Sequence, residues 1–133
     1  MEILLSELQR DWPILEAVSY NELNIGEKLQ QQPYELLKFN DQYIKAKVRM
    51  DELVDIKNRL VGKLYDKYRF DHDKALTSRE IENYYIPNNA DIIKVNNAIS
   101  KQNIVISYFE MCVKAINQLQ WNIKLYLQDR SYQ

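Results

Sequence analysis

The chain has 133 residues with 18 basic and 19 acidic side chains, yet only 2 glycines and 3 prolines. An average protein of this length carries roughly 16 glycines and prolines together. The deficit excludes turn-rich sheets and Gly-rich phosphate-binding loops, which need glycine at particular backbone positions. It favours an all-α fold, which we expect to be a single domain spanning residues 1–133.

Residues 1–32 are predicted to form short helices of acidic character. The first should cover Glu2–Asp11 and end before Pro13, and a second should lie around Tyr20–Gln31. Pro33 should occupy the first turn of the next helix, where its missing N–H costs nothing. Over residues 1–37 the sequence holds two basic and seven acidic side chains, a balance of −5.

Residues 33–70 are predicted to form one long basic helix with a heptad pattern. Eight of its ten a and d positions are apolar, which favours an amphipathic helix with a coiled-coil-like seam. The a positions are Leu36, Tyr43, Met50, Lys57 and Leu64, and the d positions are Phe39, Ala46, Leu53, Leu60 and Lys67.

A charged connection, Phe70–Leu76, should follow, and it contains the single histidine, His72. A solvated loop is the ordinary interpretation of this histidine. Thr77 and Glu80 have the spacing of a capping box that opens a short helix over residues 77–85. Asn88 or Asn89 should cap the helix after it.

Residues 91–130 are predicted to form the second long helix. Its apolar face spans three heptad columns, more than a two-stranded coiled coil needs, so it should be buried between neighbouring helices or between subunits. Two helices of roughly 55–60 Å exceed the about 30–35 Å of a compact monomer, which favours oligomerisation. The proposed oligomerisation residues are Ile99, Ile106, Phe109, Val113, Ile116, Ile123 and Leu127.

Residues 38–79 hold eleven basic and seven acidic side chains, so the near-neutral total hides a basic middle. Arg59, Lys63 and Lys67 are spaced by four residues, which forms a stripe suited to phosphates, and nearby tyrosines could stack on unpaired bases. The candidates for nucleic-acid contact are Lys45, Lys47, Arg49, Lys57, Arg59, Lys63, Lys67, Arg69, Tyr65 and Tyr68. The alternative is a solvated helix face with ion pairs such as Asp55–Arg59.

The sequence gives little support for a disulfide, a metal site, a cofactor or a membrane span. One cysteine, Cys112, excludes an internal disulfide and a Cys-based zinc site, and we expect it in the core. No metal or cofactor is expected, and no apolar run approaches the roughly 18–20 residues of a membrane span. Trp121 with Lys124 and Tyr126 forms an aromatic and basic patch that more often signals packing than ligand binding.

Three segments together resemble the UvsY family of bacteriophage recombination mediators. They are residues 63–68, residues 76–84 and residues 113–124, and the similarity covers about residues 33–130 in the order and spacing of the helices. The resemblance implies closed homo-oligomers, with a hexamer or heptamer suggested by the family, that bind single-stranded DNA. It further implies contacts with a RecA-like phage recombinase and a phage single-stranded-DNA-binding protein.

By the same resemblance, the protein would load the recombinase onto DNA coated by that binding protein, during recombination, replication and repair. It would have no catalytic site and would act in the cytoplasm of the infected bacterial host. The family's basic motif Lys-x-Arg-Leu is similar to residues 57–60, which makes Lys57 and Arg59 the first residues expected at DNA. The family motif continues into an acid and a tyrosine pair, whereas Val61 and Gly62 follow here, so Lys63, Lys67 and Arg69 are included.

Two alternatives remain open from the sequence. One is a non-catalytic helical scaffold that acts through protein contacts, which a titration with labelled single-stranded DNA would separate from a mediator. The other is a small helical enzyme of the chorismate-mutase type, which would grip a dianion with inward-facing arginines. It is disfavoured because no such arginine cluster appears in the pattern, and a turnover assay with chorismate would test it.

Overall fold

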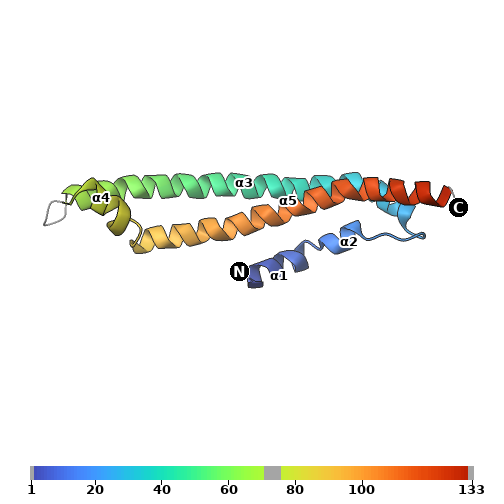
Figure 1. The fold of residues 1–133 in the computed structure, drawn as a ribbon, viewed down its shortest axis with the longest axis horizontal. Helices are drawn as coiled ribbons and strands as arrows, with labels where there is room; N and C mark the ends of the chain where they lie inside the picture. The colour runs from blue at the N-terminus through green and yellow to red at the C-terminus, as the bar shows by residue number, and fades with distance from the viewer. Residues whose placement is uncertain (1, 71–75, 132–133) are drawn as a thin grey trace. The chain divides into compact units, whose positions relative to one another are not determined.

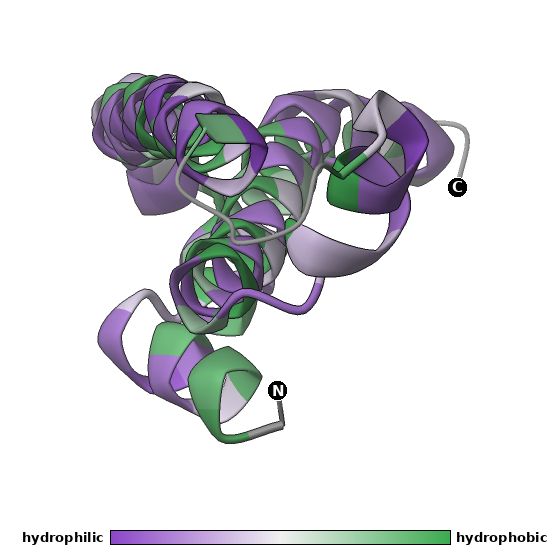
Figure 2. Ribbon diagram, turned by 90° about the vertical axis from the view of Figure 1, so that its left-hand side faces the viewer, coloured by the Kyte–Doolittle hydropathy of each residue, from purple (hydrophilic) through white to green (hydrophobic). Residues whose placement is uncertain are grey.

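The computed structural model describes residues 2–70 and 76–131, and these residues contain helices and connecting turns without a strand (Figure 1). The order is α1 Glu2–Asp11, α2 Ile14–Val18, α3 Ile25–Phe70, α4 Ser78–Glu80, the π-helical turn η1 Ile81–Tyr85, and α5 Ala90–Ser131. The all-α class and the two long helices are thereby confirmed. The helix ribbons carry both hydrophilic and hydrophobic residues, as amphipathic helices do (Figure 2). His72 lies outside the described residues.

The start of the first long helix differs from the sequence-based expectation. α3 begins at Ile25, so Pro33 is the ninth residue of the helix and does not lie in its first turn. The helix begins early because Asn21 and Asn24 form a side-chain-supported turn, in which the Asn24 side chain accepts from the Asn21 amide at 2.6 Å. The next turn then follows directly, since the Lys28 amide donates to the Asn24 carbonyl at 2.9 Å.

Tertiary packing keeps α3 helical around its internal proline. A proline inside a helix removes one backbone hydrogen bond and clashes with the preceding turn. Next to it, however, Gln32 is buried, and its side-chain amide donates to the Ile116 carbonyl of α5 at 3.3 Å. The second short helix is likewise displaced, since α2 occupies residues 14–18 and residues 19–21 are not helical.

The predicted seam of α3 is the face that the structure buries. Nine of its ten a and d positions are buried or half-buried, and Lys67 alone among the ten is exposed. Phe39 is the most enclosed of them, with 1% of its surface exposed. Helical periodicity read from the sequence therefore gives the correct inward face of this element.

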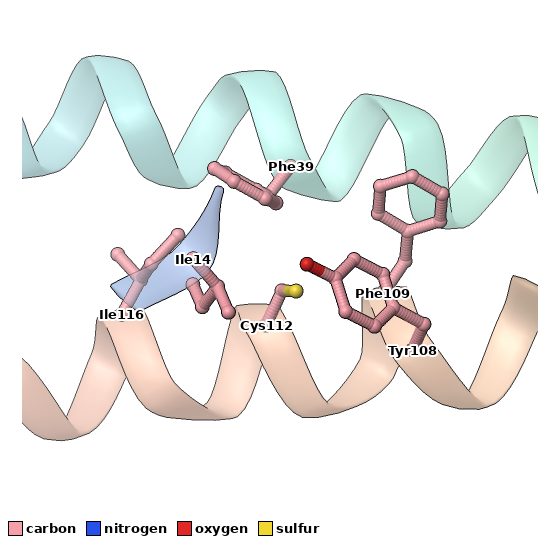
Figure 3. Close-up of a cluster of buried hydrophobic side chains, with 6 residues drawn as sticks. All are labelled: Ile14, Phe39, Tyr108, Phe109, Cys112 and Ile116. Atoms are coloured by element: carbon pink, nitrogen blue, oxygen red, sulfur yellow. The ribbon is translucent and has the colours of Figure 1, made fainter. Parts of the chain in front are cut away.

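The chain forms two compact units, each built on part of α3 and part of α5. The first contains residues 1–47 and 104–133, and the second contains residues 48–103. Within the first unit α3 and α5 lie antiparallel, and six buried side chains from α2, α3 and α5 form its core (Figure 3). These are Ile14, Phe39, Tyr108, Phe109, Cys112 and Ile116.

Trp12 closes the first core from the N-terminal side. Its ring meets Phe39 at 5.7 Å and Phe109 at 5.6 Å between centroids, both edge to face. Its carbonyl accepts a hydrogen bond from the Tyr108 hydroxyl at 2.5 Å. The non-helical linker between α1 and α2 is thus held to α5 by one aromatic anchor and one hydrogen bond.

The second unit is organised around a capped turn. Thr77 accepts from the Glu80 amide at 3.1 Å, and the Glu80 carboxylate accepts from the Thr77 amide at 3.4 Å, which confirms the capping box. The helical segment continues through η1, which carries the fully buried Ile81 into a core with Leu64, Ile86 and Ile92. The side chain of Asn89 accepts from the Asp91 amide at 2.9 Å and caps α5 as expected.

The three apolar columns of α5 are buried to different degrees. The d column, from Val95 through Phe109 to Ile123, and the g column, from Ala98 through Cys112 to Tyr126, supply most of the buried residues of α5. In the a column Ile92 is buried, Ile106 is half-buried and Leu127 is 43% exposed. Much of the wide face is therefore covered within the chain, and one edge of it is left open.

Candidate nucleic-acid interface

The basic stripe of α3, defined as Arg59, Lys63 and Lys67, lies on one exposed side of the helix. A spacing of four residues is a little over one turn, so the three side chains follow one another along the same flank. All three are exposed, whereas the neighbouring Leu60 and Leu64 face the core of the second unit. The stripe therefore presents its charges to solvent, a geometry that suits a polyanion.

The three charges of the stripe are compensated unequally. Arg59 pairs with Asp55, with 2.7 Å between Nη2 and Oδ2, and both side chains are more than half exposed. Lys63 and Lys67 make no ion pair within the described part of the chain. Because exposed ion pairs contribute only about 0–1 kcal/mol, Arg59 could exchange Asp55 for a phosphate at little cost.

The basic residues nearer the start of α3 are engaged locally. Lys45 pairs with Asp41 at 2.9 Å, and Arg49 pairs with Glu52 at 3.0 Å. The Lys47 ammonium lies 5.2 Å from the centre of the Tyr43 ring. For this part of the helix the structure matches the alternative of a solvated face with ion pairs.

The two residues first expected at DNA, Lys57 and Arg59, point in different directions. Lys57 occupies a seam position and is half-buried, whereas Arg59 is exposed. Arg69 is also exposed, and its guanidinium lies 5.6 Å from the centre of the Phe70 ring. The structure thus brings Arg59, Lys63 and Lys67 together and sets Lys57 apart from them.

Both candidate stacking tyrosines are engaged in packing. The Tyr65 hydroxyl lies 2.6 Å from the Ser78 hydroxyl, and the Tyr68 hydroxyl accepts from the Asn89 side chain at 3.0 Å. Their half-buried rings pack on the second core, and the Tyr68 ring lies 5.3 Å from that of Tyr85. They join α3 to α4 and to the start of α5, so their ring faces are largely occupied.

Two exposed aromatic side chains in the second unit were not among the sequence candidates. Phe70 is 72% exposed at the end of α3, and Tyr84 is 64% exposed on η1. The sequence did carry a signal for Phe70, because it follows Lys63 by seven residues and Lys67 by three, which places it on the same flank of the helix.

The proposed oligomerisation residues fall into two groups. Phe109, Ile116 and Ile123 are buried by their own chain. Ile99, Ile106 and Val113 are half-buried, and Leu127 is exposed enough to contact another molecule. Assembly through α5 would therefore use the second group.

Other kinds of site find no support in the described residues. They contain no group of three or more His, Cys, Asp or Glu side chains placed to hold a metal, and none of their helices is long and apolar enough to cross a membrane. Cys112 is fully buried, as expected. Trp121 is 54% exposed in its own chain, and the Lys124 ammonium lies 5.7 Å from the centre of its ring.

A comparison with known proteins finds a solved structure with a similar fold. No family model matches the chain, and no curated protein sequence matches it. The described architecture is that of an all-helical protein with two long helices and several short helical segments. The crystal structure of the bacteriophage T4 recombination mediator protein UvsY has this fold, with a TM-score of 0.81, 16% sequence identity, and coverage of 96% of this chain and 97% of that one. The chain therefore has a UvsY-like fold.

Proposed function

We propose that this protein is a recombination mediator that binds single-stranded DNA. In this role it helps a RecA-like recombinase to assemble on DNA coated by a single-stranded-DNA-binding protein. The observation that carries the proposal is the shared fold, which extends over nearly the full length of this chain and of a protein described as a recombination mediator. The role requires no catalytic group, and its place would be the cytoplasm of an infected bacterial host.

The basic stripe is the part of the surface that best fits the DNA contact. The ammonium groups of Lys63 and Lys67 have no carboxylate partner in the described part of the chain. The Arg59 guanidinium is paired only with the exposed Asp55, an ion pair that is easily broken. Binding through phosphates is independent of sequence, as a protein that handles any stretch of DNA requires.

A net charge of −1 makes a single chain a weak ligand for DNA. A homo-oligomer, proposed as a hexamer or heptamer, would present several stripes to one strand. Linked sites raise the effective concentration of each further contact, so overall affinity can exceed that of one stripe by orders of magnitude. Weak individual sites have the added advantage that the DNA can be passed on to a recombinase.

The first test is a titration of fluorescein-labelled single-stranded DNA followed by anisotropy at several salt concentrations. The double variant Lys63→Ala and Lys67→Ala should bind more weakly. Its slope of log affinity against log salt should be shallower by about 1.4 for each chain that engages the strand, since each lost phosphate contact removes about 0.7. The matched control is Lys45→Ala with Lys47→Ala, which removes the same charge from side chains already engaged.

Equal losses in the two double variants would contradict the placement of DNA on the basic stripe. Absence of binding by the unaltered protein would instead favour the scaffold alternative. The mediator role is tested separately by the DNA-dependent ATPase of the recombinase on strands coated with the binding protein. The protein should shorten the lag before ATP hydrolysis begins, and an unchanged lag would contradict the role.

A further inference from the structure

Phe70 is a large apolar side chain placed at the end of a row of cations. It ends α3, and it lies on the flank that carries Lys63 and Lys67, roughly 4.5 Å beyond Lys67 along the helix axis. It is 72% exposed, more than any other phenylalanine, tyrosine or tryptophan side chain in the described part of the chain. One exposed apolar side chain is ordinary in itself, so its neighbours decide what it means.

Both cationic and acidic side chains precede Phe70 on α3, with Asp66 one turn before it. Lys67 precedes it on the same flank, and Arg69 holds its guanidinium 5.6 Å from the ring centre. The guanidinium accounts for one contact of the ring, and the exposed fraction shows that much of the remaining surface is open to solvent. A ring contacted by an arginine and preceded on the same flank by two exposed lysines combines a stacking surface with charges for phosphates.

The helix dipole accounts for part of this arrangement. Lys67 and Arg69 lie in the last turn, where positive charge is favourable against the carbonyl end of the helix. The dipole explains neither an exposed phenyl ring nor Lys63, which lies about two turns from the end and makes no ion pair with any described residue. A ligand with both negative charge and flat apolar faces accounts for all of these features together.

We propose that Phe70 is a stacking platform for one unpaired nucleobase, with Lys63 and Lys67 holding the phosphates beside it. This inference rests on the proposed binding of single-stranded DNA and deepens it by naming the base contact. It assigns to Phe70 the role that the sequence pattern gave to Tyr65 and Tyr68, whose rings pack inward. Bases in a duplex are already stacked on each other, so the platform selects single strands.

The test compares Phe70→Ala, Phe70→Trp and the unaltered protein on two strands of equal length. One strand is oligothymidylate, and the other is fully abasic, with the same phosphates and no bases. Phe70→Ala should weaken binding to oligothymidylate by roughly tenfold or more, whereas Phe70→Trp should preserve it. Binding to the abasic strand should be the same for all three proteins. Tyr34→Ala, which removes a 67% exposed aromatic side chain elsewhere on α3, is the matched control.

Each outcome decides between the two claims. If the unaltered protein binds oligothymidylate and Phe70→Ala binds it equally well, the platform is wrong and the proposed function stands. If Phe70→Ala loses affinity for both strands alike, the ring acts through the fold or the charges, and the platform is again wrong. If the unaltered protein binds neither strand, the proposed function itself fails.

Discussion

At the scale of single residues, Tyr108 and Cys112 show how burial in the first unit changes the acidity of side chains. Tyr108 is 3% exposed, and burial raises the pKa of its hydroxyl to about 12. Burial likewise raises the pKa of the Cys112 thiol to about 11. Both groups stay neutral at physiological pH, which suits a role in packing and leaves Cys112 a poor nucleophile.

We expect the protein to lose stability in alkaline solution as a consequence. The Tyr108 hydroxyl ionises near pH 10 in the unfolded chain and near 12 in the folded one, so its contribution is complete below pH 10. It declines between about pH 10 and 12, because the unfolded state there holds fewer protons. Urea unfolding at pH 9 and pH 11 should therefore show a smaller decline for Tyr108→Phe than for the unaltered protein. An equal decline in both would contradict this origin.

At the scale of elements, α3 is a long helix that contains residues poorly suited to helices. Gly62 lies in its interior, and an added Cβ would meet no atom within 4 Å. A glycine there costs roughly 0.5–1 kcal/mol relative to alanine, since its backbone loses more freedom on folding. The continuous helix from Ile25 to Phe70 thus depends on the packing of its seam more than on its local propensities.

Replacing Gly62 with alanine should stabilise the protein by about 0.5–1 kcal/mol. The measurement is the urea midpoint at one fixed protein concentration, since assembly would shift the apparent stability. Gly26→Ala, at the second residue of α3, also has free space for its Cβ but should gain less, because helix ends are less constrained. A destabilised Gly62→Ala would mean that this surface meets another molecule.

At the scale of the whole molecule, exposed apolar side chains on α5 offer a surface through which copies of the chain could assemble. The open edge of α5 consists of the half-buried Ile99, Ile106 and Val113 and the exposed Leu127. Leu127 also lines a hollow of about 230 Å³ together with Leu29 and Ile123. An open apolar edge on a helix whose d and g columns are already covered is a suitable contact for a second copy of the chain.

Sedimentation velocity should show the unaltered protein as a homo-oligomer, of the size proposed above. Leu127→Glu should dissociate it while retaining helical circular dichroism, because the side chain is 43% exposed in its own chain. Ile116→Glu, which buries a charge in the first core, should instead reduce the helical signal itself. An unchanged sedimentation coefficient for Leu127→Glu would exclude this edge from the contact.

The amino-acid sequence by itself determined the features that depend on neighbours within a few residues. The scarcity of glycine and proline correctly indicated the all-α class, and the seam of α3 and the capping box at Thr77 were predicted correctly because they follow from local spacing. Local spacing also narrowed the cap of α5 to Asn88 or Asn89, and the structure assigns it to Asn89. The basic stripe was also predictable, since it needs only a helix and a period of four.

The tertiary structure decided what each of these side chains is free to do. Pro33 lies inside α3 beside a contact between residues 84 positions apart, and the hydroxyls of Tyr65 and Tyr68 are bound to partners 13 and 21 positions away. Contacts at such separations depend on how the chain returns on itself, which local periodicity does not encode. They turn two expected platforms into packing residues and leave Phe70, at the end of the stripe, open to solvent.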